Sequence, residues 1–242
     1  MQIKNRVFIV TGASSGIGKA TAIALTNKGG RVALLARNQS ELEELSSTLE
    51  GALPLKTDVT DFPTLKASIQ KAYDHFGQID GLVNNAGRAY QATVADIDAD
   101  IFNEIMRLNV LAPMIAMQAV IPIMRNQKEG GAIVNVNSGT AFMSIPAYSA
   151  YSSSKRALLG VSMTAREELQ SDNIVVSEVY PYITDTNFGK NKICASESVD
   201  SVDYTQGDSP EYVAGIIINA IEEGSPQYFA NKHIEGLATG KR

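Results

Sequence analysis

The sequence predicts an α/β fold in which a doubly wound parallel sheet of about seven strands is covered by helices on both faces. Short apolar runs alternate with longer helical patterns along the whole chain of 242 residues. Strands separated by helices are joined by right-handed crossovers and therefore lie parallel in one sheet. No change of composition divides the chain, so we expect a single domain over residues 1–242.

Each element follows from its own pattern. The runs with the length and apolar content of buried strands are residues 6–10, 31–36, 52–56, 79–84, 132–137 and 174–180, with a seventh expected at 227–230. The helical patterns are residues 16–28, 40–50, 62–76, 101–125, 151–169 and 210–222. Ser40 is expected to cap the second of these helices.

The segment of residues 184–209 has no clear periodicity, is rich in serine and acidic residues, and contains Gly189 and Gly207. A loop of this length in a compact domain is usually functional. It leaves the carboxyl end of the sixth strand, and open α/β sheets bind ligands outside those strand ends. We therefore expect a substrate lid here.

Composition excludes several classes of function. The chain has 44% hydrophobic residues, a net charge of -5 and no basic run, which argues against a nucleic-acid surface. The apolar run at residues 7–10 is too short for a signal peptide or a membrane span. The single cysteine, Cys194, forms no internal disulfide and has no Cys/His cluster around it for a metal. We expect a cytoplasmic protein with no metal and no membrane or nucleic-acid partner.

A glycine-rich turn connects the first strand to the first helix. Glycines at this point allow a tight turn and a close approach of the backbone to a pyrophosphate, which the helix N-terminus then attracts. The expected dinucleotide contacts in this turn are Gly12, Ser14, Ser15, Gly16, Ile17 and Gly18. A nucleoside-triphosphate P-loop is excluded, because Ala20 follows Gly18-Lys19 where Ser or Thr is required.

The end of the second strand indicates which dinucleotide binds. An NAD site usually has Asp or Glu there for the ribose 2′-hydroxyl, whereas Arg accommodates a 2′-phosphate. This chain has Ala36-Arg37-Asn38, without an acid. Arg37 therefore predicts NADP(H) as the cofactor.

Tyr151 and Lys155 are spaced for general acid–base chemistry. Positions four apart on a helix share one face, and a nearby ammonium favours the phenolate. Lowering the pKa of a tyrosine by roughly 2–3 units takes about 3–4 kcal/mol, which a cation in a dry site can supply. Alone, such a pair is most often two surface residues. Ser138 lies thirteen residues upstream of Tyr151, as a candidate hydrogen-bond donor.

Taken together, the motifs resemble the short-chain dehydrogenase/reductase family in its single-domain, Rossmann-like form, over roughly residues 3–230. In chain order they are the glycine turn, Asp58-Val59, Asn84-Asn85-Ala86-Gly87, Asn109, Ser138, and Tyr151 with Lys155. The resemblance implies that Asp58 and Val59 contact the adenine and that Asn85, Ala86 and Gly87 border the adenosine ribose.

The resemblance also implies a mechanism. Ser138 would polarise a substrate carbonyl, Tyr151 would transfer the proton, and Lys155 would bind the nicotinamide ribose and stabilise the tyrosinate. Asn109 would hold a water that connects Lys155 to solvent. The leading hypothesis is an NADP(H)-dependent carbonyl reductase, reversible as an alcohol dehydrogenase.

The chain departs from the family pattern after the sixth strand. The family commonly has Pro-Gly and then a threonine that binds the cofactor, whereas here Pro181 is followed by Tyr182. Thr184 and Thr186 are the candidate cofactor threonines. Tyr182 places a ring near the substrate.

Two other functions compete with this hypothesis. A nucleotide-sensing or structural protein of the same fold needs no general acid, so the set of Asn109, Ser138, Tyr151 and Lys155 argues against it. A hydrolase with Ser138 as nucleophile lacks the Gly-x-Ser-x-Gly pattern, and His75 and His233 are poorly placed as its base.

The substrate and the assembly are less defined by sequence. Candidate pocket residues are Phe142, Met143, Ile145, Tyr148, Tyr182 and Phe188, which suggest an apolar ketone or aldehyde. The helical patterns at 101–125 and 151–169 are apolar on more than one face, and excess apolar surface usually marks a partner site. With the resemblance, this predicts a homotetramer or homodimer. The alternative is that neighbouring elements bury all of this surface.

Overall fold

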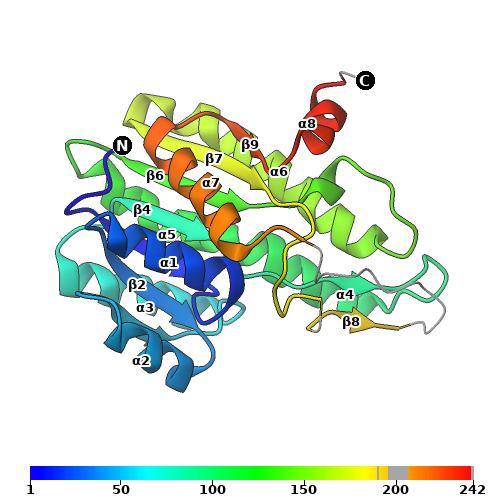
Figure 1. Cartoon of the computed structure of the whole chain (residues 1–242), viewed down its shortest axis with the longest axis horizontal. Helices are drawn as coiled ribbons and strands as arrows, with labels where there is room; N and C mark the ends of the chain where they lie inside the picture. The colour runs from blue at the N-terminus through cyan, green and yellow to red at the C-terminus, as the bar shows by residue number, and fades with distance from the viewer. Residues whose placement is uncertain (190, 196–206, 241–242) are drawn as a thin grey trace.

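A seven-stranded sheet forms the centre of the computed structural model, which describes residues 1–189, 191–195 and 207–240 (Figure 1). The strands are β1 (Val7–Thr11), β2 (Arg31–Ala36), β3 (Leu53–Lys56), β4 (Gly81–Asn84), β6 (Gly131–Val136), β7 (Ile174–Tyr180) and β9 (Gln227–Phe229). They pair in the order β3-β2-β1-β4-β6-β7-β9, each pair parallel. The chain therefore winds outward from β1 in both directions, which confirms the predicted doubly wound sheet.

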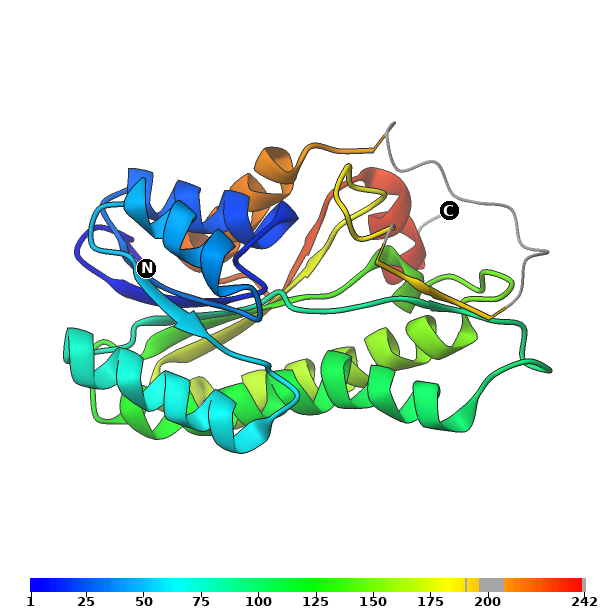
Figure 2. The ribbon, with the colours of Figure 1, turned by 90° about the horizontal axis from the view of Figure 1, so that it is seen from below.

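Helices cover both faces of this sheet (Figure 2). One layer holds α1 (Gly16–Asn27), α2 (Gln39–Ser47) and α7 (Pro210–Glu223), and the other holds α3 (Phe62–Phe76), α5 (Ala112–Arg125) and α6 (Ser149–Leu169). Two separate apolar clusters fill the spaces between the sheet and these layers. Burial on both faces explains why the central strands read as continuous apolar runs in the sequence.

The predicted helix at residues 101–125 is interrupted. It consists of α4 (Ala99–Met106), a π-helical turn, η1 (Arg107–Leu111), and α5. The N–H of Ala112 bonds the carbonyl of Arg107 five residues back. Pro113 has no N–H to offer Asn109, four residues before it, so the regular α-helical ladder cannot continue through this point.

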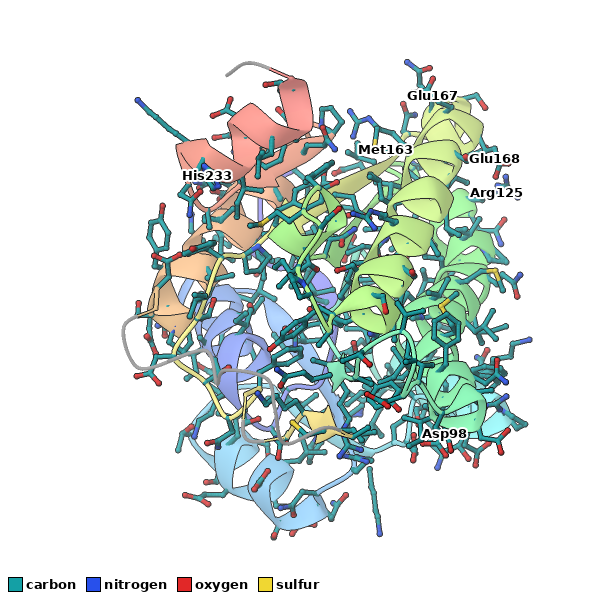
Figure 3. The ribbon with its side chains drawn as sticks, turned by 90° about the vertical axis from the view of Figure 1, so that its right-hand side faces the viewer. Asp98, Arg125, Met163, Glu167, Glu168 and His233 are labelled. Carbon is teal, nitrogen blue, oxygen red and sulfur yellow. The ribbon has the colours of Figure 1, made fainter. Side chains whose placement is uncertain are left out.

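Among the described residues, the continuous helical stretch of residues 99–125 is the one segment that is long and apolar enough to cross a membrane, judged by length and composition alone. Its α5 part packs against α3 and the sheet. Figure 3 shows the side of the molecule formed by α4, α5 and α6. Met163 lies on α6, and Asp98, which caps α4, lies at the opposite end of this side. We interpret the stretch as a core helix.

Several short elements were not expected from the sequence. A second, two-stranded parallel sheet pairs β5 (Tyr90–Gln91) with β8 (Ile193–Cys194). The 3-10 turns η2 (Gly139–Ala141) and η3 (Gln170–Asp172) flank α6, and α8 (Lys232–Thr239) follows the last strand. Of the predicted lid at 184–209, residue 190 and residues 196–206 lie outside the described residues.

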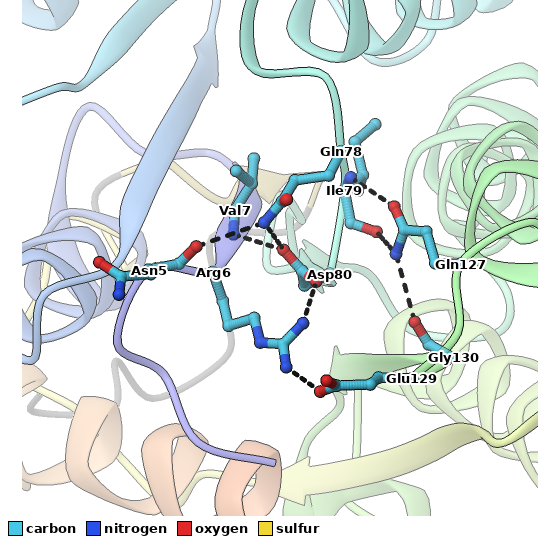
Figure 4. A network of polar contacts seen from close by, with 9 residues as sticks. All are labelled: Asn5, Arg6, Val7, Gln78, Ile79, Asp80, Gln127, Glu129 and Gly130. Atoms are coloured by element: carbon cyan, nitrogen blue, oxygen red, sulfur yellow. Dashed lines mark hydrogen bonds and ion pairs between the residues drawn. The ribbon is translucent and has the colours of Figure 1, made fainter.

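At the amino ends of the strands, a polar network holds the sheet to its connections (Figure 4). Asp80, buried just before β4, accepts hydrogen bonds from the Val7 N–H at 2.8 Å and from Arg6 at 3.0 Å. Gln78 also donates to Asp80 at 2.8 Å. This buried carboxylate is therefore fully paired, and it lies at the edge of the sheet opposite the carboxyl strand ends.

Candidate active site

A cleft of about 1050 Å³ opens at the carboxyl ends of β1, β4, β6 and β7. The predicted site residues that line it are Gly12, Ser14, Ser15, Gly16, Ile17, Arg37, Asp58, Val59, Asn85, Ala86, Gly87, Ser138, Tyr151, Lys155, Thr184 and Thr186. Gly18 and Asn109 are buried immediately behind its wall. Residues far apart in the sequence are thus brought to one place, where open α/β sheets bind ligands.

The glycine turn has no room for side chains. A Cβ on Gly18 would lie 2.3 Å from the carbonyl oxygen of Gly12, and one on Gly12 would lie 2.9 Å from Nδ2 of Asn85. Gly12 and Gly16 also have positive φ values of 65° and 53°. Asn85 Nδ2 donates to the carbonyls of Thr11 and Gly12 at 3.0 and 3.3 Å, which fixes the turn to the end of β4.

The first turn of α1 faces the cleft with its backbone donors available. Its N-cap residue, Ser15, makes no side-chain cap hydrogen bond. Helix N-terminal N–H groups without a capping side chain attract an anion such as a pyrophosphate. The methyl carbon of Thr186 lies 3.1 Å from the Cβ position of Gly16, so the segment after β7 closes over this turn. Thr184 is buried, and its hydroxyl donates to the carbonyl of Tyr182.

Arg37 lies exposed at the cleft where β2 ends. Asn38 caps α2 by accepting from the N–H of Glu41, so the chain turns away directly after Arg37. Glu41 also lines the cleft and is an acidic neighbour that sequence reasoning did not consider. On the next strand end, Asp58 accepts from the N–H and the hydroxyl of Thr60 at 2.9 and 2.7 Å.

Lys155 is buried in the floor of the cleft, with 5% of its surface exposed. Its Nζ donates to the carbonyl of Val136 at 2.9 Å and lies 5.8 Å from the ring centroid of Tyr151. Burial lowers the pKa of the Lys155 ammonium to about 8, and the charge of Glu178 opposes that effect. The buried ammonium of Lys155 therefore loses its proton more readily than that of an exposed lysine.

Asn109 connects the cleft wall to helix α6. Its Oδ1 accepts from the Arg88 N–H at 3.0 Å, and its Nδ2 donates to the Arg88 carbonyl and to Ser154 Oγ, each at 3.0 Å. A Cβ on Gly87 would lie 3.2 Å from Asn109 Oδ1 and 3.8 Å from Lys155 Nζ. The predicted Asn109 and Lys155 thus meet at the glycine that ends the Asn-Asn-Ala-Gly motif.

Ser138 projects from the end of β6, where it caps the η2 turn. Its Oγ accepts from the N–H and the hydroxyl of Thr140 at 3.2 and 3.0 Å. Because both bonds are accepted, the hydroxyl hydrogen of Ser138 is left to donate to a ligand in the cleft. An apolar cluster lies beside this donor, and it is formed by Ala89, Ile145, Tyr148, Tyr151 and Phe188. The rings of Tyr151 and Phe188 lie 5.8 Å apart, centroid to centroid.

A family model described as short chain dehydrogenase matches residues 6–195, and so covers most of the chain, including the glycine turn and the Tyr151–Lys155 helix. The chain belongs to the short-chain dehydrogenase family. Dehydrogenase/reductase SDR family member 7B of Mus musculus is 34% identical, over 98% of this chain and 76% of the mouse protein.

Solved structures resemble this short-chain dehydrogenase over nearly its whole length. A short-chain dehydrogenase from Streptomyces avermitilis is 29% identical with a TM-score of 0.87, covering 97% of this chain and 91% of that one. A short chain dehydrogenase from Burkholderia cenocepacia in complex with NADP is 26% identical with a TM-score of 0.84, covering 99% and 94% of the two chains.

Besides Glu41, sequence reasoning missed two further parts of this short-chain dehydrogenase site. Arg88 and Asn191 join the cleft wall, where Arg88 Nε donates to the Asn191 carbonyl at 2.6 Å. Glu178 of β7 is fully buried beside Lys155. The available signal for Glu178 was a charged residue inside a largely apolar strand, since carboxylates are rarely buried without a partner.

Proposed function

We propose that this short-chain dehydrogenase interconverts an apolar carbonyl compound and its alcohol with NADP(H), using Tyr151 as the general acid and base. The observation that carries the proposal is the position of Tyr151, Lys155 and Ser138 around one cleft, next to a glycine turn that admits no side chain. The ammonium of Lys155 is buried there within reach of the tyrosine ring.

The residues divide the work of carbonyl reduction. Ser138 donates its hydroxyl hydrogen to the carbonyl oxygen, where negative charge develops. Tyr151 gives its phenolic proton to that oxygen, and Lys155 stabilises the phenolate that results. In the reverse direction the phenolate takes the proton from the alcohol. Asn109 holds the Gly87–Arg88 turn in place beside Lys155.

The chain's own residues fit a nicotinamide dinucleotide. The glycine turn and the uncapped start of α1 suit its pyrophosphate. The cofactor supplies or accepts the hydride when bound. Arg37, exposed at the end of β2, suits a 2′-phosphate because a guanidinium binds phosphate with two parallel hydrogen bonds. The NADP complex of the Burkholderia cenocepacia relative supports this choice.

The wall beside Tyr151 favours an apolar substrate. Ile145, Tyr148 and Phe188 pack with Tyr151 in one cluster. Tyr182, in place of the glycine that is common in the family, is 45% exposed and also lines the cleft. A ketone or aldehyde with an aliphatic or aromatic group would bury that group here, whereas a strongly charged substrate would be desolvated without a partner.

We place the enzyme in the cytoplasm.

The test is NADPH consumption over a panel of aliphatic and aromatic ketones and aldehydes. Wild-type protein should oxidise NADPH with at least one of them, and Tyr151→Phe should bind NADPH with wild-type affinity while turnover falls about 1,000-fold or more. NADPH binding without turnover on any member would favour a nucleotide-sensing protein. Wild-type turnover by Tyr151→Phe would show that another group is the acid.

A further inference from the structure

Glu178 is a buried carboxyl group that the proposed chemistry does not use. Its residue is 0% exposed, on the central part of β7. One oxygen, Oε2, accepts a hydrogen bond from Nδ2 of Asn137, while Oε1 has no hydrogen-bond partner among the described residues. Burying a carboxyl with an unpaired oxygen costs several kcal/mol unless its environment compensates. Burial raises the pKa of Glu178 to about 7.

Asn137 links this carboxyl group to two residues of the site. Besides Glu178, its Nδ2 donates to the backbone carbonyl of Lys155 at 3.1 Å. Its Oδ1 accepts from the N–H of Ser138 at 2.9 Å. A single side chain therefore holds the carboxyl of Glu178, the helix turn that carries Lys155 and the backbone of Ser138 in one arrangement. Loss of the Asn137 side chain would remove all three bonds together.

Glu178 belongs to a row of polar residues that crosses four neighbouring strands. The residues in register are Asn84 of β4, Asn135 of β6, Glu178 of β7 and Gln227 of β9. Asn84 donates to Asn135 at 2.8 Å, and Asn135 donates to Ser162 of α6 at 2.7 Å. The amides thus have partners, and the carboxyl is the one member of the row that can carry a charge.

Few charges surround Glu178. The titratable groups that face it among the described residues are Lys155 of α6 and Tyr180 of β7. The neighbours on β6 and β9 are uncharged amides, and the Ser162 hydroxyl comes from α6. Tyr180 stays a phenol, since burial and the charge of Glu178 both raise its pKa. Lys155 is therefore the group whose charge Glu178 controls.

We propose that Glu178 is a positioning residue for this reaction, whose carboxylate, fixed beside the Lys155 helix turn by Asn137, holds Lys155 as an ammonium. The inference rests on the proposed function of Lys155. An anion facing Lys155 favours its protonated form, which offsets the burial of that group. Without the anion, the ammonium loses its proton at a lower pH, and with it goes the charge that stabilises the Tyr151 phenolate.

The experiment is a titration of Lys155 in protein labelled with 13C at lysine Cε, which needs no substrate or cofactor. Glu178→Gln keeps the size of the side chain and its bond from Asn137 but removes the charge. Its Lys155 midpoint should fall by about one pH unit relative to wild type. The alkaline limb of the turnover profile should move to lower pH by the same amount.

Asp80→Asn is the matched control, because it makes the same change in a buried, paired carboxylate at the opposite edge of the sheet (Figure 4). It should lower stability and leave the Lys155 midpoint in place. A folded Glu178→Gln with the wild-type midpoint would overturn the proposal. A wild-type protein without reductase turnover would instead refute the proposed function and leave the lysine titration readable.

Tyr180→Phe covers the case in which Glu178→Gln does not fold. The Tyr180 hydroxyl makes no well-formed hydrogen bond to Oε1, but it is close enough to lower the pKa of Glu178 and so to favour its charged form. Its removal should make Glu178 more neutral at pH 7 and lower the Lys155 midpoint by a smaller amount than Glu178→Gln. An unchanged midpoint in this variant would overturn the proposal on its own.

Discussion

Asn109 Nδ2 donates a 3.0 Å hydrogen bond to Ser154 Oγ, and the Ser154 hydroxyl donates onward to the carbonyl of Tyr151 at 2.7 Å. This chain of two bonds ties the π-helical turn η1 to the helix that carries the proposed acid. The Asn109 amide also bonds both the N–H and the carbonyl of Arg88. A polar side chain that is poorly suited to a helix interior is thus fully used here.

Asn109→Ala should therefore weaken both stability and turnover. It leaves the Arg88 N–H and carbonyl without their buried partner, at a cost of about 2–3 kcal/mol in the free energy of unfolding. Urea denaturation and a turnover assay would measure the two effects. Asn103→Ala, at an exposed position of α4, is the control and should change neither. Equal stability of the two variants would show that the hydrogen bonds between Asn109 and the Arg88 backbone do not stabilise the fold.

Lys155→Ala should impair two functions together. The proposal assigns one ammonium to the ribose and to the tyrosinate, so NADPH affinity and turnover should both fall, the latter by roughly 100-fold or more. Tyr148→Phe should keep the proton-transfer step, because Tyr148 has Ser152, not a lysine, four residues further on. Fluorescence titration gives the affinity and NADPH consumption gives the rate. If Lys155→Ala lost turnover with unchanged affinity, the ribose contact would be wrong.

The preference between NADPH and NADH should change when the residues at the end of β2 are substituted. Ala36→Asp combined with Arg37→Ala supplies an acid for a 2′-hydroxyl and removes the cation for a 2′-phosphate. NADPH should bind about 10–100-fold more weakly and NADH more tightly, as measured by titration calorimetry. Lys66→Ala, an exposed lysine of α3, controls for a general loss of positive charge. Tighter binding of NADH than NADPH by the wild type would refute this interpretation.

Stability should depend on pH through Glu178. Its pKa is raised from 4.5 to about 7, so the stability that it contributes is complete below pH 4.5 and is lost as pH rises through 7. A glutamine at this position does not ionise, so the variant does not lose stability in this way as pH rises. The stability of Glu178→Gln relative to wild type should thus improve between pH 5 and pH 8, by about 1–3 kcal/mol. Denaturant unfolding at the two pH values measures the difference, and a constant difference would argue that Glu178 is not neutral at pH 5.

The protein should assemble as a homotetramer or homodimer through the layer that contains α5 and α6. Half-buried apolar residues remain on these helices, among them Ile115 and Ile121 of α5 and Met163 of α6 (Figure 3). Light scattering at micromolar concentration should show the oligomer, and Met163→Glu should dissociate it because a buried, unpaired charge is costly. Gln70→Glu, at an exposed position of α3, is the control. A stable wild-type monomer would reject this assembly.

The sequence alone predicted the order of the large elements well. Strong periodicity over many residues places a strand or helix reliably, as at residues 31–36 and 62–76, which match β2 and α3. Two-residue strands such as β5 and β8 have no period to detect. The break at η1 was not predicted, although Pro113 is present in the sequence, because proline is also tolerated in the first turn of a new helix.

Sequence motifs predict those parts of the candidate site that lie in local patterns, and they miss the parts that depend on contacts between elements. The glycine turn and the Tyr151–Lys155 pair are local patterns, and the structure brings both to one cleft. Glu178 could not be linked to Lys155 from sequence, since strand register and helix packing decide which side chains meet. The bond from Asn137 to the Lys155 carbonyl spans eighteen residues and two elements, and no spacing rule describes it.

Thr186 lies against Gly16 of the glycine turn, and its Oγ1 accepts from the N–H of Phe188, whose ring faces Tyr151. In the proposed function, the dinucleotide site and the substrate site therefore share three consecutive residues. A change selected in this segment for a new substrate will also alter the affinity for the dinucleotide. Laboratory evolution of this enzyme toward new substrates should accordingly produce compensating changes in the glycine turn, and libraries that vary both segments together should outperform libraries that vary either alone.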